Sequence, residues 1–193
     1  MQTDIIIAGV GGQGILSIAA CIGMVAIEDD LHFKQSEVHG MSQRGGAVQS
    51  NLRISDREID SDLIPLGKAD MIISVEPMES LRYLPWLSED GWLITNTTPV
   101  KNINDYPDED KIIKEIEKIR NHVIIDADKI ARETGSSRAS NIVILGAASQ
   151  FLKIDQDKLE SAIAEVFKRK GNRIVELNLQ AFRSGREFTN TKS

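Results

Sequence analysis

The sequence predicts an α/β protein that folds as a single Rossmann-like domain, with a largely parallel sheet and helices on both of its faces. Two observations predict this class. Short, continuous apolar runs recur along the chain, as in strands buried on both sides, and segments with helical character lie between them. The 193 residues are enough to bury one full core. We expect one domain over residues 1–185, followed by a frayed polar tail over residues 186–193.

The first half of the chain contains most of the expected strands. Apolar runs and alternating segments place them at residues 3–10, 33–38, 47–54, 69–75 and 91–96. The segment from Gly14 to Asp30 is small and apolar nearly all round, which is typical of a buried helix. Another helix is expected over residues 78–87, where Pro85 bends or shortens it. The long loop between the second and third strands is a candidate functional loop.

The second half of the chain is expected to be mainly helical. A polar surface loop is predicted over residues 97–110, and one further strand over residues 122–127. Helices are predicted over residues 111–121, 140–153, 155–170 and 172–185, and apolar periodicity supports the first and third of them. Asp155 is the expected N-cap of the helix that follows it, and Gly171 is expected to end that helix.

Composition and charge exclude several classes of function. The net charge of −6 argues against a nucleic-acid binder, although Arg44, Arg53 and Arg57 can still form a local basic pocket. The single cysteine, Cys21, is expected in the core, and one thiol cannot hold an iron–sulfur cluster. The start of the chain lacks a basic segment, and its apolar run is too short for a signal peptide or a membrane span. We therefore expect a cytoplasmic protein without membrane contact.

A glycine-rich loop between the first strand and the first helix is a candidate phosphate site. Gly9, Gly11 and Gly14 match G-x-G-x-x-G in this context, and a helix N-terminus attracts phosphate. The match is incomplete, because Ile15 stands where a P-loop has lysine, and no acidic residue ends a second strand at the usual spacing. Phosphate binding and simple close packing therefore both remain open. Gln13 favours a ligand or a partner, because an outward glutamine at a helix start has little value in a core.

The loop GVGGQGI (residues 9–15) is followed by a second motif, SEVHGMSQRGG (residues 36–46). Together these motifs resemble the gamma-type chain of the 2-oxoacid:ferredoxin oxidoreductases, enzymes that oxidatively decarboxylate 2-oxoacids to acyl-coenzyme A. The resemblance covers residues 4–185 and includes SDLIPLGKADMIISVEP, VIIDADKIARETGSSRASNIVILGA and NLQAFRSG. The pyruvate and 2-oxoglutarate branches usually carry Tyr- or Phe-Gly-Pro in the second motif. VHGMSQRGG is instead similar to the indolepyruvate branch, whose small subunit is called beta.

The resemblance implies a non-catalytic small subunit of an enzyme that acts on arylpyruvates with ferredoxin as electron acceptor. Thiamine diphosphate and iron–sulfur clusters are then expected on a large alpha subunit, through which ferredoxin is also reached, because this chain lacks the GDG…NN motif and the cysteines. No residue here is expected to be catalytic or to bind a metal. The isolated chain is expected to form a homodimer. The residues expected at coenzyme A or at the subunit interface are Gly11, Gly12, Gln13, Gly14, Ser42, Gln43, Arg44, Gly45 and Gly46.

Two alternatives remain open. One is a gamma subunit of a pyruvate- or 2-oxoglutarate:ferredoxin oxidoreductase, and the other is a stand-alone Rossmann nucleotide-binding protein. Within the second motif, Glu37 and His39 are expected to make loop or interface hydrogen bonds rather than to act in catalysis. Glu76, after a predicted strand, is expected to cap a helix or to contact a partner.

Overall fold

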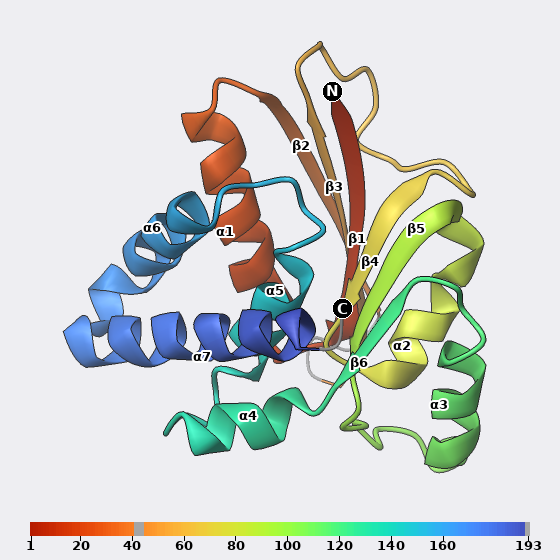
Figure 1. Cartoon of the computed structure of the whole chain (residues 1–193). Coiled ribbons are helices and arrows are strands. Elements are labelled where there is room, and N and C mark those ends of the chain that lie inside the picture. Colours follow the sequence, from red (N-terminus) through yellow and green to blue (C-terminus); the bar gives the residue numbers. More distant parts are fainter. Residues whose placement is uncertain (41–44, 192–193) are drawn as a thin grey trace.

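The computed structural model describes residues 1–40 and 45–191, which form one sheet between two layers of helices (Figure 1). The strands are β1 (Gln2–Val10), β2 (His32–His39), β3 (Ala47–Ser55), β4 (Ala69–Ser74), β5 (Leu87–Asn96) and β6 (His122–Ile125). The helices are α1 (Ile15–Glu28), α2 (Pro77–Arg82), α3 (Glu109–Ile116), α4 (Ala127–Glu133), α5 (Ser140–Ala148), α6 (Gln156–Phe167) and α7 (Asn172–Asn190). Two short 3-10 turns follow α2 and α6, at Leu84–Trp86 and Lys168–Lys170.

The sheet has the strand order β2-β3-β1-β4-β5-β6. Strands β1, β4, β5 and β6 pair in parallel, whereas β3 is antiparallel to both β1 and β2. The sheet is therefore parallel over its larger part and ends in an antiparallel hairpin at the β2 edge. The predicted α/β class with a mostly parallel sheet is confirmed. The hairpin arises because only residues 40–46 connect β2 to β3, whereas a parallel pair needs a crossover of a dozen residues or more.

Two hydrophobic cores, one on each face of the sheet, explain why the strands are continuous apolar runs in the sequence. Ile5 and Ile7 of β1 belong to the core shared with α1, α5, α6 and α7, whereas Ile6 belongs to the core shared with α2 and α3. Successive side chains of a strand point to opposite faces, so a strand covered on both sides needs apolar residues at every position. Figure 1 shows these two groups of helices on opposite sides of the sheet.

Several element boundaries differ from those expected from the sequence. Helix α2 ends at Arg82, and Pro85 falls in the following 3-10 turn, as expected for a residue without a backbone N–H. Helix α3 starts before its apolar stripe, because Asp108 caps it by accepting a hydrogen bond from the backbone N–H of Lys111. The N-cap role of Asp155 is confirmed by its hydrogen bond from the backbone N–H of Asp157 at 2.8 Å.

The expected frayed tail is wrong over the segment Arg186–Asn190, which continues α7 as regular helix. This segment stays ordered because α7 packs closely across α5. A Cβ atom added at Gly185 would lie 2.0 Å from the carbonyl oxygen of Val143, so the two backbones touch where glycine is the only residue that fits. Thr189, beyond this crossing, is buried. The helix therefore extends well past Gly185.

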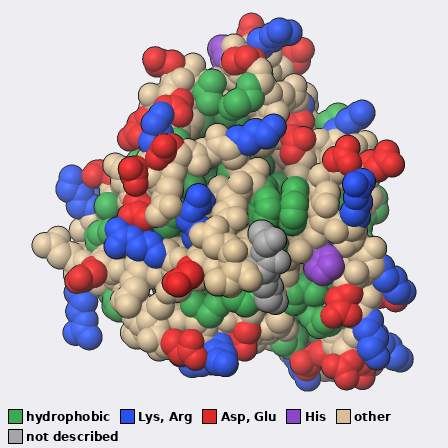
Figure 2. Space-filling view, in the orientation of Figure 1, with side chains coloured by type: hydrophobic (Ala, Val, Ile, Leu, Met, Phe, Trp, Pro, Cys, Tyr) green, Lys and Arg blue, Asp and Glu red, His purple; other side chains and the backbone are tan. Residues whose placement is uncertain are grey.

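On the side that Figure 2 presents, Lys and Arg side chains are scattered among Asp and Glu side chains. Among the described residues on that face, the Lys and Arg side chains do not form one continuous area of the kind that binds a polyanion. None of the helices in residues 1–40 and 45–191 combines the length and the apolar character needed to cross a membrane.

Candidate functional site

The first glycine motif forms the turn between β1 and α1. Gly12 and Gly14 have backbone φ angles of 102° and 78°, which lie in the region that favours glycine. Gly14 is the N-cap of α1 and makes no side-chain cap, so the positive end of a 14-residue helix is left without a side chain to neutralise it. Gly12 is exposed, and a Cβ atom placed on it would meet no neighbour. This arrangement can accept an anionic group or a carbonyl oxygen.

Gln13 does not point outward, and this expectation is wrong. Its Oε1 accepts a hydrogen bond from the backbone N–H of Val10 at 2.7 Å, and its Nε2 donates to the carbonyl oxygen of Val75 at 3.2 Å. The side chain thus satisfies backbone groups at the ends of β1 and β4, where each strand leaves the sheet. Gln13 braces the glycine loop from the inside.

The second glycine motif lies against the first. The backbone N–H of Gly11 donates to the carbonyl oxygen of Gly46 at 2.9 Å, and that of Gly45 donates to the carbonyl oxygen of Gly11 at 3.4 Å. These contacts extend the β1–β3 pairing beyond its last pair, Val10 and Ala47. The structure therefore brings residues 11–14 together with Gly45 and Gly46. Ser42, Gln43 and Arg44 lie outside the described residues.

A third segment, the loop of residues 97–110, also reaches this place and was not expected from the sequence. The side-chain Nδ2 of Asn102 donates to the carbonyl oxygen of Gly45. The loop follows β5, whose carboxyl end lies at the same edge of the sheet as that of β1, which is where ligand sites of α/β proteins occur. The position of the loop after a strand was the only feature of the sequence that could indicate a role at this site, since the loop itself is polar and irregular.

Glu76 holds the loop in place. Its side chain is fully buried (0% exposed) and caps α2 by accepting from the backbone N–H of Glu79 at 2.8 Å. Its other carboxylate oxygen accepts from the backbone N–H of Val100 at 3.2 Å and from the Tyr106 hydroxyl. Burial and the adjacent carboxylate raise the pKa of Tyr106 above its usual range, so the hydroxyl remains a donor. The expected capping role of Glu76 is confirmed.

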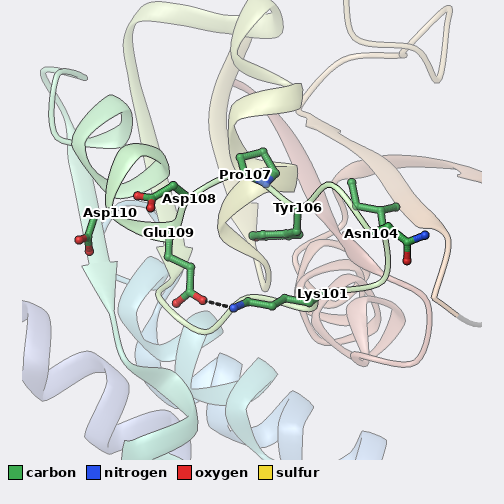
Figure 3. Close-up of a pocket in the computed structure, with 8 residues that line it drawn as sticks. Lys101, Asn104, Tyr106, Pro107, Asp108, Glu109 and Asp110 are labelled. Atoms are coloured by element: carbon green, nitrogen blue, oxygen red, sulfur yellow. Dashed lines mark ion pairs between the residues drawn. The ribbon is translucent and has the colours of Figure 1, made fainter.

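A polar hollow of about 580 Å³ opens on the outer side of this loop (Figure 3). Figure 3 shows Tyr106 beside Pro107, and Lys101 reaching to Glu109, whose carboxylate lies 2.6 Å from the Lys101 Nζ. Asp108 and Asp110 also line the hollow, so its charge is negative overall. An acidic, open hollow of this kind does not suit a phosphate-bearing ligand, and the glycine surface is the better candidate.

Glu37 and His39 lie on the exposed edge strand β2, rather than in a loop. His39 Nε2 and Glu37 Oε2 are 3.1 Å apart, which confirms the expected hydrogen-bonding role. His39 pairs with Val48 in the ladder with β3. Both side chains remain accessible to a partner.

Arg53 does not contribute to a basic pocket, contrary to expectation. Its side chain is 13% exposed, and its Nε donates to Asp4 Oδ1 at 2.8 Å. Its Nη1 donates to the carbonyl oxygens of Ser61 and Leu63, so Arg53 fixes the chain that follows β3. Arg57 is exposed on the surface.

Cys21 lies on the buried face of α1, in the core, as expected. Burial raises the pKa of its thiol to about 12. Among residues 1–40 and 45–191 no group of three or more His, Cys, Asp or Glu side chains is placed to hold a metal ion.

Comparison with known proteins places this geometry in a family. Residues 4–188 match the Pyruvate ferredoxin/flavodoxin oxidoreductase family. Indolepyruvate oxidoreductase subunit IorB of Methanothermobacter thermautotrophicus is 36% identical over 192 residues, which cover 96% of each chain. The subunit of the same name from Archaeoglobus fulgidus is 37% identical and covers 96% of this chain and 94% of its own length.

Solved structures agree on the fold. The gamma subunit of a keto/oxoacid ferredoxin oxidoreductase from Geobacter sulfurreducens superposes with a TM-score of 0.70 at 25% identity, covering 98% of this chain and 99% of that one. A 2-oxoglutarate:ferredoxin oxidoreductase from Magnetococcus marinus, solved with 2-oxoglutarate, coenzyme A and succinyl-CoA bound, superposes with a TM-score of 0.77 at 21% identity. That match covers 98% of this chain and 31% of the other, and it supports the fold alone. The chain belongs to the pyruvate ferredoxin/flavodoxin oxidoreductase family.

Proposed function

We propose that this protein is the small subunit of an indolepyruvate oxidoreductase, a 2-oxoacid:ferredoxin oxidoreductase that acts in the cytoplasm and converts arylpyruvates to aryl-acetyl-coenzyme A. One observation carries the assignment. Relatives named as this subunit match the chain at 36–37% identity over nearly their whole length. The second motif, VHGMSQRGG, points to the same branch of the family. A pyruvate- or 2-oxoglutarate-specific gamma subunit is the less supported assignment.

The chemistry then resides on a large partner subunit. That subunit carries thiamine diphosphate and the iron–sulfur clusters, and ferredoxin docks on it. The small chain is unsuited to hold a cluster, because its single thiol, Cys21, is enclosed in the core and a cluster needs about four thiolates. The small chain instead contributes a surface.

That surface is the pair of glycine motifs, and it contacts coenzyme A or the large subunit. Gly12 and Gly14 offer backbone groups at the start of α1, whereas Gly11 joins the two motifs, because its N–H and carbonyl oxygen pair with Gly46 and Gly45. Gln13 acts indirectly, by holding the loop in shape. Arg44, with Ser42 and Gln43 beside it in the sequence, adds a planar guanidinium that can bind a phosphate or carboxylate through two hydrogen bonds.

The substrate assignment is tested with the small chain reconstituted with the large subunit from the same genome. Reduction of ferredoxin is measured with indolepyruvate, pyruvate and 2-oxoglutarate, each with and without coenzyme A. We expect the highest kcat/KM for indolepyruvate and no turnover without coenzyme A. A preference for pyruvate or 2-oxoglutarate would assign the chain to another branch.

The role of the second motif is tested in the same assay with Arg44→Lys, because lysine keeps the charge but loses the two-pronged geometry. We expect the melting temperature of the isolated chain to stay within a few degrees. The KM for coenzyme A, or the dissociation constant of the two subunits, should rise about ten-fold or more, from the roughly 1.5–3 kcal/mol of a charge-assisted hydrogen bond. Arg57→Lys, at an exposed arginine, is the matched control. A loss of stability with unchanged assembly and coenzyme A kinetics would make Arg44 structural.

A further inference from the structure

Helix α1 has the composition of a buried helix but is covered on one side only. It carries no charged residue from Ile15 to Ile27, a pattern typical of helices enclosed all round. Helix α5 has the same character and is buried along its length, beneath α7. In α1, however, Leu16 is 50% exposed and Ile27 is 65% exposed. Within the described residues, the outer side of α1 is therefore apolar and left uncovered.

The apolar residues on the outer face of α1 form one stripe, in which Leu16, Ala20 and Ile27 are exposed and Met24 is half-buried. Leu16, Ala20, Met24 and Ile27 follow the spacing of one helix face. Edge strand β2 runs beside this stripe, and the Phe33 ring lies so close to α1 that a Cβ atom on Gly23 would be 2.7 Å from its Cζ. Between α1 and β2 a groove of about 430 Å³ is left, lined largely by apolar atoms of Ala20, Met24, Ile27 and Phe33. We name it the α1–β2 groove.

Charge distinguishes the possible occupants of the groove. Glu28 lines one end, and the nearby Lys158 is already paired with Asp29. The whole chain carries a net charge of −6, so a second copy would bring a further acidic surface to this end. An occupant with a basic side chain at the Glu28 end and apolar side chains along the stripe fits better.

The apolar stripe, which runs past the end of the groove, starts close to the glycine surface. Leu16, the first residue of the stripe, lies two positions beyond Gly14, the N-cap of α1. Any large partner that contacts the glycine motifs can therefore extend over α1 without a break.

We propose that the α1–β2 groove docks an apolar segment of the large subunit, with a lysine or arginine of that segment facing Glu28. This inference rests on the proposed function, because the large subunit is the partner which that function supplies. It adds a second contact area, on the opposite side of α1 from the core, to the one that the glycine motifs supply.

The test compares groove and control variants in binding to the large subunit, titrated by biolayer interferometry at fixed ionic strength. Ile27→Lys and Ala20→Lys place a charge on the stripe at exposed positions of α1 and should leave the melting temperature of the isolated chain unchanged within a few degrees. Leu66→Lys is the matched control, because Leu66 is 64% exposed and lies outside the groove, between β3 and β4. We expect the groove variants to bind at least ten-fold more weakly than the wild type and the control to bind equally.

Glu28→Lys tests the polarity of the contact and should weaken binding by a smaller factor that disappears in high salt. The inference is overturned if the groove variants bind the large subunit within two-fold of wild type, even when they change self-association of the small chain. In that case the wild-type pair still turns over indolepyruvate, and the proposed function stands. If the wild-type chain neither binds the large subunit nor restores its activity, the proposed function fails and this inference fails with it.

Discussion

At the scale of single residues, Gln13 illustrates how the glycine surface is built. Its side-chain amide hydrogen-bonds to the backbone at the ends of two strands, at Val10 and at Val75. Val75 lies 62 positions further along the chain. Nothing local to GVGGQG indicates this partner, so the sequence suggested an outward side chain. The glycine spacing of this motif did place Gly11 and Gly14 correctly at the turn. The backbone conformation of a turn depends on neighbouring residues, whereas the hydrogen-bond partners of a side chain can lie far away in the sequence.

We expect Gln13→Ala to destabilise the fold, because it leaves the backbone N–H of Val10 without its acceptor. The free energy of unfolding should fall by about 1–3 kcal/mol. Urea denaturation of the isolated chain measures it, with Gln180→Ala on the exposed side of α7 as control, expected within about 0.5 kcal/mol of wild type. Equal effects of the two substitutions would mean that Gln13 does not brace the loop.

Cys21 should behave as a core residue rather than as a reactive thiol. Its pKa is raised from 9.0 to about 12 by burial, so we expect negligible modification by a thiol reagent at pH 8 in the native state and full modification in urea. The folded state holds this proton longer than the unfolded state. The stabilising contribution is therefore complete below pH 9.0 and declines as the pH rises toward 12. Rapid stoichiometric labelling of the native chain would contradict the buried assignment.

At the scale of elements, the pattern of the sequence predicted strands better than it predicted the loop of residues 97–110. Strands β1 and β4 are buried on both faces, and an unbroken apolar run is enough to locate them. The loop depends on contacts between distant segments, from Glu76 to Tyr106 and from Asn102 to Gly45. A polar segment with prolines gives no indication of such contacts, which only the folded chain brings together.

Tyr106→Phe should loosen this loop. The change removes a donor from the buried carboxylate of Glu76, so we expect a loss of about 1–3 kcal/mol in the free energy of unfolding. Backbone amides of residues 97–106 should also exchange hydrogen faster. Tyr83→Phe is the control, because the Tyr83 hydroxyl makes no hydrogen bond within residues 1–40 and 45–191, and it should change neither measurement. Unchanged exchange in Tyr106→Phe would show that the backbone contacts alone hold the loop.

At the scale of the whole molecule, the described residues form one α/β sheet with two cores and leave a glycine surface and an apolar groove uncovered. Both features agree with a subunit that has a neighbour in a complex, while the two cores are built from residues of this chain. The sequence alone indicated the family and the position of the glycine motifs. It did not reveal the groove, because the apolar residues of α1 were expected to be enclosed by the chain itself.

We expect the isolated chain to self-associate, most simply as a two-fold dimer, because an exposed apolar stripe favours contact when the large subunit is absent. Sedimentation velocity over a range of concentrations measures this, and added large subunit should replace the self-associated form. The Ile27→Lys variant should self-associate less than the Leu66→Lys control. A chain that stays monomeric at high concentration would contradict the expectation.

The most direct test of the central assignment is one activity measurement on three samples: the small chain alone, the large subunit alone, and their reconstituted complex isolated by size-exclusion chromatography. Each is assayed for indolepyruvate- and coenzyme A-dependent reduction of ferredoxin. We predict turnover that follows the complex peak and is absent from the small chain. Turnover by the small chain alone, or full turnover by the large subunit without it, would contradict the account.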